Sequence, residues 1–143
     1  MFRGQFEHSI DAKGRLSIPA KFRDVLQARA SGRLVVTNHD RCVYAYAFPD
    51  FEEIEKKLAS APQTEVQRAF IRRFIGGAHE CDIDNTGRIL VPPPLRAYAS
   101  LSRDVMLVGG AKHFEIWALD RWKAEDAKNE QLVAANRDFI PDI

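Results

Sequence analysis

Apolar residues separated by short turns predict two β-hairpins at corresponding places in the chain. The first joins the runs RLVVT (33–37) and CVYAYAF (42–48), and the second joins DVMLV (104–108) and HFEIWAL (113–119). All four runs are rich in β-branched and aromatic residues, which favour strands, and turn residues separate the members of each pair. Each half of the chain is therefore expected to contain one such hairpin.

A shorter hairpin is predicted ahead of each of these. Ile10 and Leu16 flank the sequence DAKG, in which Gly14 can supply the positive φ of a tight reversal. Gly87 has the same role in the second half. A proline follows each time and starts a turn, so each half is expected to run hairpin, Pro-started turn, hairpin.

In the segment between the two halves, apolar residues recur at helical spacing instead of alternating with polar ones. Asp50 is the expected N-cap of a first helix, which ends where proline breaks the pattern at 60–62. Thr64 with Gln67 forms the capping box of a second helix, which stops at Gly76. Phe51, Ile54 and Leu58 form the apolar face of the first helix, and Val66, Phe70 and Phe74 form the apolar stripe of the second.

A last helix is predicted from Asp120 towards Asn136. Its apolar positions are sparse, and the residues expected to face inward are Trp122 and Leu132 or Val133.

The two halves are related by an internal repeat. HSIDAKGRLSIPAKFR (8–23) aligns without gaps onto CDIDNTGRILVPPPLR (81–96). Six of the sixteen positions are identical, whereas average composition would give about one by chance. The identities are Ile10/Ile83, Asp11/Asp84, Gly14/Gly87, Arg15/Arg88, Pro19/Pro92 and Arg23/Arg96. We therefore interpret the chain as an internal duplication.

Each copy of the repeat carries an Asp and, four residues later, an Arg across the tip of its short hairpin. The carboxylate is expected to cap turn amides and to orient the guanidinium, which then suits an anion or a guanine edge. One such pair is usually a solvated surface pair that contributes about 0–1 kcal/mol. Two of them, in Asp11–Arg15 and Asp84–Arg88, indicate a pseudo-twofold arrangement that presents both tips.

Composition restricts the class of protein. With 143 residues, of which 45% are hydrophobic and 29% charged, the chain has room for one compact domain or two small ones. The net charge of +1 gives no overall support for a nucleic-acid or membrane partner, but residues 1–33 hold seven basic against three acidic side chains. The two cysteines have no metal-ligand spacing, and no apolar run is long enough to cross a membrane, so we expect a cytoplasmic protein.

MFRG at the start, HSIDAKGRLSIPAKFR and DNTGRILVPPPLR together resemble the MraZ proteins of the SpoVT/AbrB superfamily, which are bacterial DNA-binding β proteins. The resemblance implies a mainly β fold with helices (α+β), in which two AbrB-like swapped-hairpin halves form a double-split β-barrel. The expected parts are half 1 (5–48), a helical spacer (49–77), half 2 (78–121) and a C-terminal helix and tail (122–143).

The resemblance also implies a function. It predicts a nucleoid-associated regulator that forms ring-like homo-oligomers, binds direct repeats in double-stranded promoter DNA and represses its own operon in the division and cell wall gene cluster. The implied DNA-binding residues are Arg3, Lys13, Gly14, Arg15 and Arg88, and the implied orienting residues are Asp11, Asp84 and Gly87. Because Thr86 stands where the first copy has Lys13, we expect the first tip to dominate.

Other classes of function find less support. No metal site is expected, because His79 and Cys81 lack further ligands at suitable spacing, and no cofactor or small-molecule substrate is expected either. Catalysis is not expected, since each repeated Asp has an Arg that keeps it ionised and no known catalytic motif occurs. The alternative is an antitoxin-like or scaffold module whose acidic tail (120–143) binds a protein partner.

Overall fold

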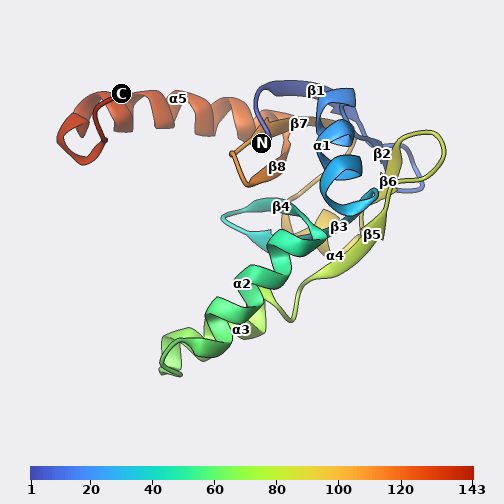
Figure 1. Ribbon diagram of the computed structural model, residues 1–143. Helices are drawn as coiled ribbons and strands as arrows, with labels where there is room; N and C mark the ends of the chain where they lie inside the picture. Colours follow the sequence, from blue (N-terminus) through green and yellow to red (C-terminus); the bar gives the residue numbers. More distant parts are fainter.

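The computed structural model describes residues 1–143 and shows a mixed α+β fold built on antiparallel strands (Figure 1). The strands form one six-stranded sheet in the order β1-β7-β8-β4-β3-β5 and a separate two-stranded ribbon, β2-β6. The strands are β1 (Gln5–Ser9), β2 (Arg15–Ser17), β3 (Arg33–His39), β4 (Cys42–Ala47), β5 (His79–Asp82), β6 (Arg88–Leu90), β7 (Asp104–Gly109) and β8 (His113–Ala118). The helices are α1 (Ala20–Ala30), α2 (Phe48–Ser60), α3 (Glu65–Phe74), α4 (Pro93–Tyr98), α5 (Leu119–Ala135) and a 3-10 turn, η1 (Arg137–Phe139).

The strand order has the twofold character that the repeat predicts. Exchanging each strand for its counterpart in the other half reverses the order of the sheet, so the pseudo-twofold axis passes between β4 and β8. The outer strands are exchanged between the halves, because β1 pairs with β7 and β5 pairs with β3. Neither half is complete without a strand from the other.

The β3–β4 and β7–β8 hairpins are confirmed, but the short leading hairpins are wrong as pairs of neighbouring strands. Within the first of them only a single bridge, Ile10 to Leu16, joins the two limbs. Beyond that bridge β1 joins the main sheet and β2 pairs with β6 of the other half. The tip is a local feature of the sequence, whereas the partner of each limb is set by the packing of the two halves.

Helices α1 and α4 stand where Pro-started turns were expected, and this prediction is wrong. Pro19 and Pro92 are the N-cap residues, a position at which the absent N–H of proline costs nothing. Helix α1 buries only Phe22 and Leu26, and α4 buries only Leu95. With so few buried positions, the sequence of each helix is hard to distinguish from that of a loop.

The predicted N-cap is confirmed for α3 and wrong for α2. Thr64 is the N-cap of α3, and its hydroxyl accepts a hydrogen bond from Gln67 N at 3.1 Å. Helix α2 begins at Phe48 rather than at Asp50, and the Asp50 carboxylate pairs with Arg29 of α1. In α5, Trp122 is buried as expected.

The prediction that Leu132 or Val133 faces inward is wrong. The exposed fractions of these two residues are 56% and 50%. Helix α5 extends beyond the edge of the sheet, so its distal half has no surface of its own chain to cover (Figure 1).

The main core lies on one face of the sheet, beneath α1 and α4. Phe22 of α1 packs edge-to-face on Phe2 and Phe6, with ring centroids 5.3 and 5.2 Å apart, and lies 4.9 Å from the ring of Phe114. Strand residues alternate between faces, so the opposite face has its own smaller clusters. These are Val35, Tyr46, Phe51 and Phe74 under α2 and α3, and Cys42, Trp117 and Trp122 under α5.

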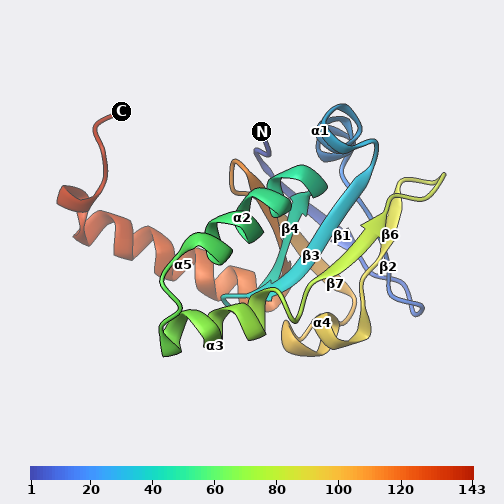
Figure 2. The same cartoon turned by 60° about the horizontal axis from the view of Figure 1, so that its bottom comes forward.

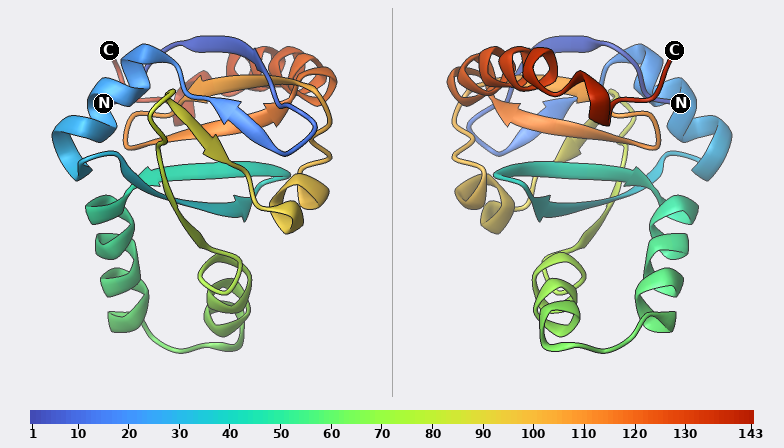
Figure 3. Two further views of the ribbon diagram at one scale, coloured as in Figure 1. Left: turned by 90° about the vertical axis from the view of Figure 1, so that its right-hand side faces the viewer. Right: turned by 90° about the vertical axis from the view of Figure 1, so that its left-hand side faces the viewer.

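Two helical projections leave the body of the molecule. Figure 3 shows α2 and α3 extending together below the sheet and α5 lying along the top. None of the helices combines the length and the apolar character needed to span a membrane.

Replacing Phe22 by Ala should lower the free energy of unfolding by about 3–5 kcal/mol, because the substitution leaves a cavity among three phenylalanines. Urea denaturation at fixed protein concentration measures the change. Leu90→Ala is the control, since Leu90 is 56% exposed and its replacement should change stability by no more than about 0.5 kcal/mol. A loss at Phe22 no greater than at Leu90 would contradict the packing described here.

Candidate nucleic-acid interface

The first tip is closed by the side chain of Asp11. Its Oδ1 accepts hydrogen bonds from the backbone N–H groups of Lys13 and Arg15, both at 2.9 Å. Its Oδ2 accepts a further bond from Arg15 Nε at 2.8 Å. Gly14 closes the reversal at φ +88°, where an L side chain would be strained, and its N–H donates to the Asp11 carbonyl at 3.0 Å. One carboxylate thus fixes both the turn and the guanidinium.

The second tip has the same backbone but a different hold on its arginine. Asp84 Oδ1 accepts from the N–H groups of Thr86 and Arg88 and from the Thr86 hydroxyl, at 2.8–3.0 Å. Arg88 Nε donates to Thr86 Oγ1 at 2.8 Å and lies 3.7 Å from Asp84 Oδ2. Thr86 therefore mediates between the carboxylate and the guanidinium, at the position where the first tip has Lys13.

The β2–β6 ribbon brings the two tips together. Its register sets Arg15 opposite Leu90 and Ser17 opposite Arg88, so both arginines lie on the same face of the ribbon. Leu16 and Ile89 point the other way and are buried. Arg88 Nη1 reaches to 3.9 Å from Asp11 Oδ2, so Asp11 lies between the two guanidinium groups. Figure 2 shows both tips projecting from the same side of the molecule, away from α3 and α5.

Each tip is also supported by the other half. Val91 N donates to the Gly14 carbonyl at 2.8 Å, and Ile18 N donates to the Gly87 carbonyl at 2.9 Å. The Arg96 guanidinium packs against Gly14, where a Cβ would lie 2.8 Å from its Cζ. Arg23, the counterpart of Arg96, packs against Gly87 in the same way, and its Nη1 leaves no room for a Cβ there.

Sequence reasoning found Arg23 and Arg96 as repeated residues but missed their place at the tips. Their recurrence at equal distance from the two glycines was the available signal. Both arginines add positive charge beside the tips. Counted with Lys13, Arg15 and Arg88, they give this region five basic side chains against the two carboxylates of Asp11 and Asp84.

The structure does not bring Arg3 to the tips. Phe2 bridges to Ala111 beside the β7–β8 turn, which is the opposite end of β1 from Asp11. The five residues of β1 alone separate the two places by about 16 Å. Lys13, by contrast, is exposed at the first tip itself.

Hydrogen bonding keeps both tip carboxyls ionised. The backbone N–H of Arg15 is the main cause of the lowered pKa of Asp11, and the Arg15 side chain and the N–H of Lys13 add to it. The backbone N–H of Arg88 likewise lowers the pKa of Asp84, with help from the Thr86 hydroxyl. At neutral pH each tip therefore has a charged acceptor and a charged arginine.

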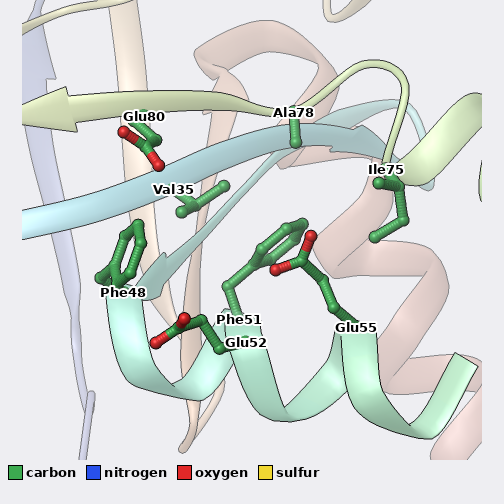
Figure 4. Close-up of a pocket in the computed structure, with 8 residues that line it drawn as sticks. All are labelled: Val35, Phe48, Phe51, Glu52, Glu55, Ile75, Ala78 and Glu80. Carbon is green, nitrogen blue, oxygen red and sulfur yellow. The ribbon is translucent and has the colours of Figure 1, made fainter. Parts of the chain in front are cut away.

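A hollow beside α2 is unsuited to phosphate. Figure 4 shows an apolar floor surrounded by three glutamates. The lining residues are Val35, Phe48, Phe51, Glu52, Glu55, Ile75, Ala78 and Glu80. Their carboxylates would repel a nucleic-acid backbone. The tips are the better candidate for a nucleic-acid contact.

The comparison with known proteins explains the two equivalent tips. The family described as "MraZ protein, putative antitoxin-like" matches the chain twice, over residues 1–73 and 74–139, so each match contains one tip. The chain belongs to the MraZ family. This confirms the resemblance drawn from the sequence and the repeat that it contains.

Members of the MraZ family from several bacteria are similar to this chain over most of its length. A protein named transcriptional regulator MraZ from Desulforapulum autotrophicum is 45% identical over 131 residues, which cover 92% of this chain and 89% of that protein. Its namesake from Syntrophobacter fumaroxidans is 49% identical, with coverage of 86% and 83%. The one from Coxiella burnetii is 44% identical, with coverage of 100% and 97%.

The carboxyl groups of Asp11 and Asp84 should titrate below 3.8, the ordinary value for aspartate. Because the pKa in the folded state is lowered, their contribution to stability is complete above about 3.8 and is lost as the pH falls through the lower folded value. Carboxyl ¹³C NMR across an acid titration measures both midpoints.

Arg15→Ala is a matched test of the cause of this shift. It removes the side-chain bond to Asp11 but keeps the backbone N–H bond, so the midpoint of Asp11 should rise only part of the way to 3.8. Asp84 should titrate as before, because its largest hydrogen bond comes from Arg88 N. A midpoint for Asp11 at or above 3.8 in the unmodified protein would contradict the described tip.

Proposed function

We propose that this protein is a sequence-specific DNA-binding transcriptional regulator that reads DNA through the tips of the β2–β6 ribbon. The observation that carries the proposal is the placement of Arg15 and Arg88 on one exposed face, with Asp11 between them. The names of the MraZ relatives support the regulatory class. No catalytic role is proposed.

The hydrogen bonding of the arginines supports a role in reading bases. Arg15 uses Nε for Asp11, and Arg88 uses Nε for Thr86, so the Nη groups of both stay available as donors, with Arg88 Nη1 3.9 Å from Asp11 Oδ2. Two parallel N–H donors match the O6 and N7 acceptors of guanine in the major groove, which admits a two-stranded ribbon. The fixed Nε bond reduces the conformational entropy that a free arginine would lose on binding.

The remaining predicted residues take supporting roles in this proposal. Lys13 is exposed at the first tip and contacts phosphate, while Gly14 and Gly87 allow the backbone to reverse close to the DNA. Asp11 and Asp84 orient the arginines. Arg3 lies outside this surface, and its contact with DNA is a separate prediction.

We propose that a ring of copies engages direct repeats upstream of the protein's own operon, in the division and cell wall gene cluster, and represses it. The net charge of +1 favours this arrangement, because one small basic surface neutralises few phosphates. Several tips at fixed spacing raise avidity by roughly 10²–10⁴ without any new contact. The regulator would then act in the cytoplasm, on the nucleoid.

We also propose that the six-stranded sheet and the ribbon together form the double-split barrel that the resemblance implies. His8 Nδ1 and the Ser17 carbonyl, 2.6 Å apart, connect β1 to β2. The functional division of the chain is 5–48, 49–77, 78–121 and 122–143.

An antitoxin-like or scaffold module is the second candidate. The description of the family favours it, as does the free distal part of α5. It predicts a protein partner and no discrimination between DNA sequences.

Arg15→Ala should weaken binding to the protein's own upstream DNA by roughly 5- to 150-fold, the loss of about 1–3 kcal/mol expected for a bidentate base contact. Arg88→Ala should cost less, since the second tip lacks a lysine. Fluorescence anisotropy near 150 mM salt measures both, with shuffled DNA as the reference. Arg137→Ala, which removes an exposed arginine from the C-terminal tail, is the matched control and should bind normally. Equal binding of native and shuffled DNA by the intact oligomer would refute the proposal.

Asp11→Ala distinguishes a role of Asp11 in positioning Arg15 from the effect of its negative charge on DNA binding. Removing a negative charge should strengthen contact with phosphate, but loss of three hydrogen bonds frees Arg15, so we expect several-fold weaker operator binding. Asp24→Ala removes the same charge from an exposed position on α1 and is the control. Tighter operator binding by Asp11→Ala than by Asp24→Ala would show that Asp11 does not orient a base-reading arginine.

A further inference from the structure

An open hollow of about 550 Å³ lies beside the first tip. It is lined by Ser9, Ile10, Asp11, Ala12, Ser102 and Arg103. The first four residues lead from β1 into the tip, and the last two belong to the connection between α4 and β7, in the other half of the chain. The volume is within the range of sites that hold a small ligand, so one sugar and phosphate of a nucleic-acid strand fit there.

The backbone of the α4–β7 connection is fixed against the first tip, and this places Arg103. Ile10 N donates a hydrogen bond to the Arg103 carbonyl at 2.7 Å. The next residue, Asp104, pairs with Ser9 in the register of β1 and β7. Figure 3 shows the connection rising from α4 to β7 past the first tip. The side chain of Arg103 is exposed, so its guanidinium is accessible to a partner.

The two charges of this connection face different sides. Asp104 lines another hollow, at the start of α5, together with Lys123. Successive residues of an extended chain point to opposite sides, so Arg103 faces the tip while the carboxylate of Asp104 faces α5. The carboxylate of Asp11, which also lines the hollow at the tip, already accepts three hydrogen bonds, one of them from the guanidinium of Arg15. The hollow is therefore suited to an anion.

The second tip has no counterpart of Arg103. Ile83 N donates to the Gly32 carbonyl at 3.1 Å, so Gly32 stands beside the second tip where Arg103 stands beside the first. The arginine that follows, Arg33, lies with its Cζ 4.0 Å from the centroid of the Phe48 ring, at the start of α2. The repeat thus supplies both tips with the same backbone bond but only the first with a basic side chain next to it.

We propose that Arg103, with the hydroxyls of Ser9 and Ser102, binds a backbone phosphate of the DNA duplex whose bases Arg15 reads. The inference rests on the proposed function for the identity of the ligand. A guanidinium donates two parallel hydrogen bonds to phosphate oxygens, and serine hydroxyls donate to them as well. Phosphate contacts fix the position of a duplex and carry no sequence information. Arg103 therefore anchors DNA at the first tip, and the second tip binds without this anchor.

The salt dependence of DNA binding by Arg103→Ala tests the contact. Fluorescence anisotropy of the full-length protein gives the affinity for native and for shuffled DNA over a series of salt concentrations. Loss of one phosphate contact should reduce the slope of log affinity against log salt by about 0.9 for each first tip engaged. Both DNAs should be weakened by the same factor, because a phosphate contact is independent of sequence. Arg103→Lys keeps the charge and should keep the slope.

Lys123→Ala is the matched control, because it removes an exposed positive charge on the α5 side of the same connection and should leave the slope unchanged. The midpoint of the Asp11 carboxyl in Arg103→Ala checks that the tip is intact. It should match the wild type, since Arg103 is not among the causes of the lowered pKa of Asp11. A wild-type slope in Arg103→Ala with an intact tip would overturn the inference. So would a loss confined to native DNA, which would make Arg103 a reader of bases.

The two DNAs keep this inference apart from the proposed function. Discrimination between native and shuffled DNA by the wild type tests sequence-specific binding, whereas the slope measured on shuffled DNA tests the phosphate contact alone. A reduced slope in Arg103→Ala without discrimination by the wild type would support the contact and refute sequence-specific reading. An unchanged slope with intact discrimination would do the reverse. Absence of binding to either DNA would refute both.

Discussion

The exchange of strands between the two halves is the constraint on which the structure depends. Each half keeps its own long hairpin but gives its first strand to the hairpin of the other half, as the pairings β1–β7 and β5–β3 show. The β2–β6 ribbon can then form only where the halves meet, and the carbonyls of Gly14 and Gly87 accept their bonds from the opposite copy. Neither tip is therefore complete unless the two halves are packed together.

The exchange of strands also explains which structural features the sequence predicts and which it does not. Turns, caps and neighbouring strands depend on residues close in the chain, and the β3–β4 and β7–β8 hairpins and the Thr64 cap were predicted correctly. The partners of β1 and β2 lie in the other half, where periodicity gives no information about pairing. Helix α1 was missed because its apolar pattern, Phe22, Val25 and Leu26, spans little more than one turn after a proline that was expected to start a turn.

The candidate site shows the same division. The repeated Asp and Arg identified the tips, since their contacts span only four residues. The packing of Arg96 on Gly14 and of Arg23 on Gly87 was not predicted, because each contact crosses between the halves and only the recurrence of the two arginines points to it. Arg3 was associated with the tip by its place in the sequence, but β1 carries it to the far end of the sheet.

The difference between Lys13 and Thr86 gives the ribbon a direction. A pair of identical tips about a twofold axis looks the same from either end, as does a palindrome in a DNA duplex. Here one tip carries a free ammonium group, whereas the other uses a hydroxyl to hold its own arginine. A duplex lying across this ribbon would therefore meet distinct head and tail ends, and successive copies would all have to face the same way along it.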